Sequence, residues 1–117
     1  SFTDEWVRDH PTEIKEYMAM RLKDLPSVET VLRYILGRQA LDIESRLKDI
    51  KVPSLVLVGD REDNLIADDM THWDAAQVLA NGIPGAIFTV LSGQRHCYFQ
   101  TIPDEVNRII RDFIASA

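Results

Sequence analysis

Residues 52–63, VPSLVLVGDRED, predict a buried β-strand that ends in an acidic loop. The apolar run is short, nearly unbroken and rich in valine, which is typical of a parallel strand covered on both faces. Pro53 lacks an amide hydrogen and suits the first position of the strand. Gly59 then allows a sharp turn. The loop carries three acidic residues, Asp60, Glu62 and Asp63. In open α/β sheets, ligands bind at this end of the strands, so the loop is a candidate site.

A second strand is predicted at residues 86–91, AIFTVL, and the loop after it carries His96. Residues 71–79 between the strands have helical spacing, so the order strand, helix, strand predicts a parallel pair with a right-handed crossover. An acid after the first strand and His96 after the second can then meet at one sheet edge. The carboxylate would fix the tautomer of the imidazole and leave its other nitrogen as a base. The pattern alone fits an ordinary loop histidine and a solvated acidic turn at least as well.

The residues before this region are amphipathic and helical, with no predicted strand. Four helices are expected there, at residues 4–8, 11–25, 27–36 and 42–47. Gly37 suits the C-terminal cap of the third. A last helix is expected from Pro103. The fold class is therefore α/β, with a helical segment at residues 1–50 and a βαβα part with two parallel strands at residues 51–117.

Composition limits the possible partners and location. The chain has 117 residues, which suits one domain, and its hydrophobic content of 45% and charged content of 27% are ordinary for a soluble protein. With a net charge of -6 and no basic cluster, neither nucleic acid nor an anionic membrane is an expected partner. No apolar run approaches the roughly 20 residues of a membrane span, and no signal peptide is visible. A single cysteine favours a reducing compartment, so we expect a cytoplasmic location.

Other reactive side chains carry weaker signals. Cys97 follows His96 directly, but adjacent residues of an extended chain point to opposite sides, so Cys97 is interpreted as structural. His10 and His72 have no partner at metal-ligand spacing in the sequence, and no glycine-rich phosphate loop follows a strand. No metal site and no cofactor are expected.

These stretches resemble a known family. Residues 50–60, IKVPSLVLVGD, resemble the strand unit of the α/β-hydrolase family that carries the acid of the catalytic triad. Residues 83–96, IPGAIFTVLSGQRH, resemble the next unit, which carries the catalytic histidine. The apolar positions of residues 103–114 match the closing helix, and the helices before Ile50 look like the family's lid. The resemblance covers nearly the whole chain and implies the carboxyl-terminal half of a lidded hydrolase.

The resemblance also implies roles for individual residues. The family's acid usually lies three residues after the glycine, which is Glu62 here. The sequence DNLIA that starts at Asp63 matches the family's Asp-x-hydrophobic-hydrophobic-Pro if one extra residue is allowed. Asp63 is therefore the first choice for the acid and Glu62 the second. His96 matches the catalytic histidine, although Arg95 stands where the family has glycine and Thr101 where it tends to have glutamate.

The family's nucleophile elbow, Gly-x-Ser-x-Gly, does not occur in this sequence. The resemblance therefore implies a hydrolase of esters, lactones or related small apolar acyl substrates whose nucleophile, whether Ser, Asp or Cys, lies outside this chain. The chain alone is expected to be inactive. It is expected to pair with a missing amino-terminal half or to self-associate through an exposed strand edge. The alternative is a non-catalytic α/β binding or interaction module derived from a hydrolase.

Overall fold

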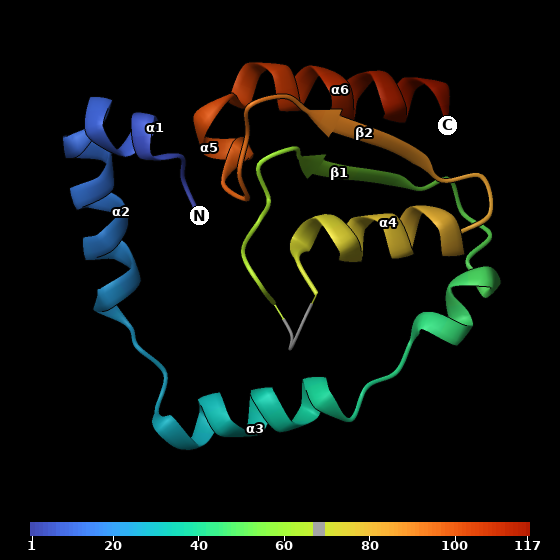
Figure 1. The fold of residues 1–117 in the computed structure, drawn as a ribbon, viewed down its shortest axis with the longest axis horizontal. Helices are drawn as coiled ribbons and strands as arrows, with labels where there is room; N and C mark the ends of the chain where they lie inside the picture. The colour runs from blue at the N-terminus through green and yellow to red at the C-terminus, as the bar shows by residue number, and fades with distance from the viewer. Residues whose placement is uncertain (67–69) are drawn as a thin grey trace. The chain divides into compact units, whose positions relative to one another are not determined.

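The structure is a computed structural model that describes residues 1–66 and 70–117, and it is an α/β chain with a two-stranded parallel sheet. In chain order the elements are α1 (Asp4–Asp9), α2 (Pro11–Lys23), α3 (Val28–Gln39), the 3-10 helix η1 (Glu44–Asp49), β1 (Leu55–Gly59), α4 (His72–Gly82), β2 (Ile87–Leu91), α5 (Tyr98–Thr101) and α6 (Pro103–Ser116) (Figure 1). The chain forms two compact units, residues 4–43 and residues 1–3 with 44–117. None of the helices in the described part of the chain has the length and hydropathy to cross a bilayer.

The helical unit contains α1, α2 and α3. Helix α2 begins at Pro11, and Ser27 caps α3 by accepting a hydrogen bond from the Thr30 amide at 3.2 Å. The expectation that Gly37 ends this helix is wrong, because α3 continues to Gln39. Glycine inside a helix costs only about 1 kcal/mol relative to alanine, and the good helix formers around Gly37 outweigh that cost.

Apolar side chains of the helical unit are exposed rather than packed into a core. Helix α2 has no buried residue. Five side chains that the helical spacing would place on an inward face are exposed, namely Met18, Leu22, Val31, Leu32 and Ile35. The amphipathic pattern of the sequence is therefore present in the helices, but within residues 4–43 these five side chains lack the covering layer that such a pattern predicts.

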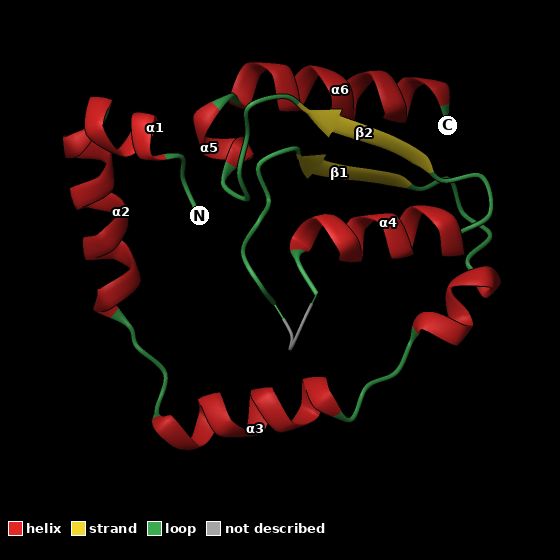
Figure 2. Cartoon of the chain, in the orientation of Figure 1, coloured by secondary structure: helices red, strands yellow, loops and turns green. Residues whose placement is uncertain are grey.

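The α/β unit is organised around β1 and β2, which run side by side in the same direction (Figure 2). Leu55 pairs with Ile87 at one end of the register and Gly59 with Leu91 at the other, which confirms the predicted parallel pair. Connecting the strands, α4 packs on β1, and Val56, Val58 and Ala76 form the buried cluster between them.

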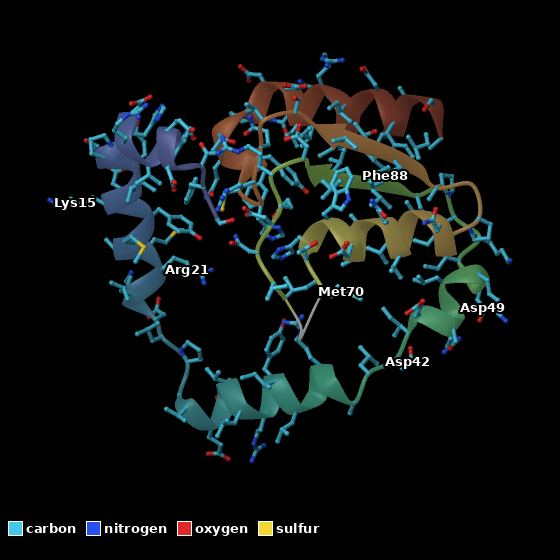
Figure 3. All side chains as sticks on the ribbon, in the orientation of Figure 1. Lys15, Arg21, Asp42, Asp49, Met70 and Phe88 are labelled. Atoms are coloured by element: carbon cyan, nitrogen blue, oxygen red, sulfur yellow. The ribbon has the colours of Figure 1, made fainter. Side chains whose placement is uncertain are left out.

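Strand β2 is more exposed than β1. The apolar run of β1 led us to expect strands that are covered on both faces. Ile87, Phe88 and Val90 are 37–49% exposed, whereas Val58 on β1 is buried. Phe88, labelled in Figure 3, meets the Trp73 ring of α4 edge to face with centroids 6.0 Å apart. The described residues therefore bury mainly one strand of the pair.

Both ends of α4 are set by local contacts. Thr71 caps the helix in a reciprocal capping box with Asp74, in which the Asp74 amide donates to Thr71 Oγ1 and the Thr71 amide donates to Asp74 Oδ2. The helix extends through Gly82, past the end expected at residue 79. There an added Cβ would lie 2.6 Å from the buried Leu47 side chain of η1, so η1 packs closely against α4. This packing groups η1 with the α/β unit, whereas the sequence suggested a division between residues 50 and 51.

Gly59 is required for a different reason from the one the sequence suggested. It does not have the positive φ of a glycine turn, but an added Cβ would collide with the carbonyl of Gln94. The loops after the two strands approach closely here, and the hydrogen bonds that join them include Asp60 N–H to Leu91 O (3.1 Å), Arg61 N–H to Gln94 O (3.0 Å) and Gly93 N–H to Asp60 Oδ1 (2.7 Å). The missing side chain of Gly59 therefore allows the two loops to bind each other.

We predict that Gly59→Ala destabilises the α/β unit by about 1–3 kcal/mol, the usual cost of forcing atoms into a packed site. Urea or thermal unfolding followed by circular dichroism would measure it. Gly37→Ala is the matched control, because no atom of the described residues lies within 4 Å of its added Cβ and alanine favours the helix. Equal stability of the two variants would contradict the close approach at Gly59.

Candidate functional site

The candidate site lies at the carboxyl ends of β1 and β2, where the two joined loops and the first turn of α4 contribute one side chain each. Glu62 comes from the loop after β1, His96 from the loop after β2, and His72 is the first residue of α4. The parallel register brings both strand ends to the same edge, as the sequence predicts.

Glu62 is the buried centre of this site, with only 2% of its surface exposed. Its Oε1 lies 3.3 Å from His96 Nδ1, and its Oε2 lies 3.5 Å from His72 Nδ1. The two imidazole rings are tilted by 31° with centroids 4.1 Å apart. One buried carboxylate therefore lies beside two histidines that are each partly open to solvent, with 30% of the His72 side chain and 49% of the His96 side chain exposed.

Burial raises the pKa of the Glu62 carboxyl group, because the charged form loses its hydration. His96, the amino-terminal ammonium and Arg95 oppose this effect but do not cancel it. Within the described residues, the two carboxylate oxygens are fully enclosed and lie at ion-pair distance from the imidazoles without the alignment of hydrogen bonds. A buried carboxylate in this state is stabilised by a proton or by a closer cation.

Asp63, the first choice for the acid, lies elsewhere. Its side chain is 67% exposed, and its Oδ2 is 3.2 Å from Arg95 Nη2. The expected contact between Asp63 and His96 is replaced by the contact between Glu62 and His96. The Arg61 amide, one residue before Glu62, donates to the Gln94 carbonyl of the second loop, and Asp63, one residue after Glu62, pairs with Arg95 at the surface.

The one-residue shift that favoured Asp63 also used Ala67, which lies outside the described residues. Glu62, three residues after Gly59, is the residue that contacts the imidazole. Which of the two acids acts in a reaction stays a prediction.

Residues of α5 make hydrogen bonds that hold the loop carrying His96 in place. Thr101 Oγ1 donates to Gln94 Oε1 at 2.6 Å, so Thr101 ties this helix to the loop that carries His96. Tyr98 donates from its hydroxyl to the Leu57 carbonyl at 3.3 Å. Burial, and then the negative charge of Glu62, raise the pKa of Tyr98. Cys97 is buried, consistent with a structural residue.

His72 is the member of the site that the sequence analysis missed. Its spacing from other histidines and acids carries no metal or catalytic pattern, because the three residues come from three separate segments. A signal was available in the capping pair Thr71 and Asp74, which fixes where α4 begins. The first turn of a helix that follows a parallel strand starts at the same sheet edge as the strand ends, so His72 could have been placed there.

The fold and site together define an α/β chain with a buried acid and a histidine at the ends of neighbouring parallel strands. No protein-family model matches the chain. The chain is 28% identical over 110 residues to a protein of Pseudomonas savastanoi pv. phaseolicola named "Putative carbamate hydrolase RutD". The matched region covers 94% of this chain and 40% of the relative.

Proteins of the same name from two further bacteria are also similar to this chain. Identity is 26% over 112 residues in Pseudomonas syringae pv. syringae, covering 96% of this chain and 41% of that protein, and 27% over 112 residues in Azorhizobium caulinodans, covering 96% and 40%. The chain therefore spans about 40% of the length of the curated relatives it matches.

We predict that Glu62→Gln becomes more stable relative to the unchanged chain as the pH rises from about 4 to about 7. A carboxyl group whose pKa is raised by folding favours the folded state below its unfolded pKa, and this contribution is lost as the pH rises through the folded value. The amide of the Glu62→Gln variant does not titrate, so the variant does not lose this stability as the pH rises. Melting temperatures of both proteins across this pH range would test the sign.

Asp74→Asn is the matched control with the opposite sign. Hydrogen bonds from Thr71 lower the pKa of Asp74, so its contribution is present above the unfolded pKa and is lost as the pH falls. If Glu62→Gln instead loses stability relative to the unchanged chain as the pH rises, burial is not the dominant influence on Glu62.

Proposed function

We propose that this chain is the carboxyl-terminal, acid- and histidine-bearing part of an α/β-hydrolase. The observation that carries the proposal is the contact between Glu62 Oε1 and His96 Nδ1, at the ends of neighbouring parallel strands. In this arrangement the carboxylate holds the imidazole in one tautomer and stabilises the imidazolium. His96 Nε2 is then the base for a nucleophile supplied by another part of the protein.

The proposed reaction is attack on an acyl carbon. Esters, lactones and carbamates all pass through a tetrahedral oxyanion, so one acid–histidine pair serves each of them. The carbamate is included because the relatives carry that substrate in their name. The sequence has no Gly-x-Ser-x-Gly elbow, so both the nucleophile and the oxyanion donors must come from elsewhere. No cofactor is needed for this chemistry, and we propose a cytoplasmic location.

The proposed partner is the missing amino-terminal half of the same hydrolase. Two features support it: the exposed apolar side chains of α2 and α3, which suit lid helices over a small apolar substrate, and the exposed residues Phe88 and Val90 of β2. In the described part of the chain, β1 is hydrogen-bonded to β2 alone, which leaves one edge for a further strand. Self-association through that edge is the alternative.

A second candidate is a non-catalytic α/β module derived from a hydrolase. Arg95 favours it, because a glycine stands at this position in the hydrolase pattern. The Arg95 side chain is 22% exposed and pairs with Asp63. A bulky cation thus precedes the histidine in the chain where the hydrolase pattern has a residue without a side chain. Activity of the protein encoded by the complete reading frame decides between the two candidates.

We predict that His96→Ala lowers kcat/KM of the complete protein by about 10⁴-fold or more, and Glu62→Gln by about 10³-fold, as expected for members of a triad. Hydrolysis of an activated short-chain ester and of a carbamate would be measured. Asp63→Asn is the matched control and is expected to stay within about threefold, because Asp63 faces solvent and Arg95. A large loss in Asp63→Asn with none in Glu62→Gln would reverse the assignment of the acid.

We also predict that the 117-residue chain alone hydrolyses these substrates no faster than buffer, because it lacks the nucleophile elbow. Adding a separately produced amino-terminal part that carries Gly-x-Ser-x-Gly should restore turnover. Turnover by the chain alone that disappears in His96→Ala would show that a nucleophile lies within it.

A further inference from the structure

We propose that Glu62, His72 and His96 form a binding site for a divalent metal ion of the zinc class. Each residue offers one ligand atom, and the three atoms lie within 4.8 Å of one another. The proposal goes beyond the hydrolase function, because it uses His72, which the acid–histidine pair does not need. It also concerns binding, which can be measured without any catalytic activity.

The distances suit a small ion. Zinc binds imidazole nitrogen and carboxylate oxygen at about 2.0–2.2 Å, so two ligands of a tetrahedral site lie about 3.4 Å apart. Glu62 Oε1 is 3.3 Å from His96 Nδ1 and Glu62 Oε2 is 3.5 Å from His72 Nδ1, so each imidazole lies at about this separation from one of the two carboxylate oxygens. Both imidazoles are partly exposed, so small ring movements can bring their nitrogens to the ion.

The chemistry of the three donors is also appropriate. Two imidazoles and one carboxylate form a donor set that zinc uses in proteins, with a fourth position left for water. Glu62 is 2% exposed, and its oxygens have no aligned hydrogen bond among the residues that the structure describes, so a bound cation would add to the charge compensation of the carboxylate. The exposed surfaces of His72 and His96 provide the route for the ion and the open side for water.

Two positive groups that act on Glu62, the Ser1 ammonium and Arg95, oppose a cation at the site. Arg95 Nη2 lies 3.2 Å from Asp63, whose carboxylate offsets its charge. Tyr98 contributes a neutral hydroxyl that donates to the Leu57 carbonyl and does not compete for the ion. Glu62 is the carboxylate that lies beside both imidazoles, so it would supply the negative charge of the site.

Metal binding and the proposed base catalysis exclude each other. The ion would occupy the Glu62 oxygen and the His96 nitrogen whose direct contact orients the imidazole. The bound state would therefore hold His96 away from a nucleophile. Zinc would act as an inhibitor of the complete hydrolase rather than as its cofactor.

The test is a calorimetric titration of the chelator-treated 117-residue chain with Zn²⁺ at neutral pH, repeated by visible absorption with Co²⁺. We expect one ion per chain and a four-coordinate Co²⁺ spectrum without a thiolate charge-transfer band. Glu62→Gln and His72→Gln should each weaken binding at least tenfold. His72→Gln changes a partly exposed side chain, so it keeps the test decisive if Glu62→Gln fails to fold.

Two control variants separate this site from others. His10→Gln should bind within twofold of the unchanged chain, because His10 lies in the helical unit, where its Nδ1 is 3.0 Å from the Trp6 carbonyl. Cys97→Ser should also bind the metal ion as tightly as the unchanged chain. The proposal is overturned if His72→Gln binds as tightly as the unchanged chain, if binding is lost in Cys97→Ser, or if no ion binds at all. None of these results depends on whether the complete protein is a hydrolase.

Discussion

The hydrogen bonds between the two strand-end loops determine the rest of the α/β unit. The carbonyl of Gln94 accepts a hydrogen bond from the Arg61 amide. This carbonyl lies so close to Gly59 that a side chain at position 59 would have no room. Two segments that are distant in sequence are thereby held with their backbones in contact. The neighbouring acids of the loop after β1 point in different directions, with Glu62 inward and Asp63 outward.

Placing a carboxylate in the interior creates the electrostatic character of the site. Glu62 lies among the described atoms at the sheet edge, where hydration is lost and the charged form is costly. His96 and His72 each place a ring nitrogen near this carboxylate, and burial, together with the negative charge of the carboxylate, raises the pKa of Tyr98. A buried charge rarely adds stability by itself.

The sequence predicted the parts of this arrangement that depend on local pattern. The strand at β1, the parallel partner at β2 and the edge at which His96 lies all follow from short apolar runs and the length of the crossover. It could not tell which acid, Glu62 or Asp63, would contact His96, because the two are adjacent in sequence and differ only in their three-dimensional neighbours. Nor could it place His72, whose neighbours are assembled only in three dimensions. Gly37 shows the same limit, because a favourable local cap signal was overridden by the helix around it.

Glu62 has two proposed roles that exclude each other, as the partner of His96 in base catalysis and as a metal ligand. The exposure of the histidines decides which role is possible. A general base needs an enclosed, water-poor pocket around the imidazole, yet about half of the His96 side chain is exposed in the described residues. In that open state an ion in solution can reach the imidazole and the carboxylate beside it. The proposed amino-terminal half, if it covers the site, would exclude water and ions together and strengthen the contact between Glu62 and His96 as the local dielectric falls. Under the two proposals, the same residues bind metal when uncovered and act as an acid–histidine pair when covered.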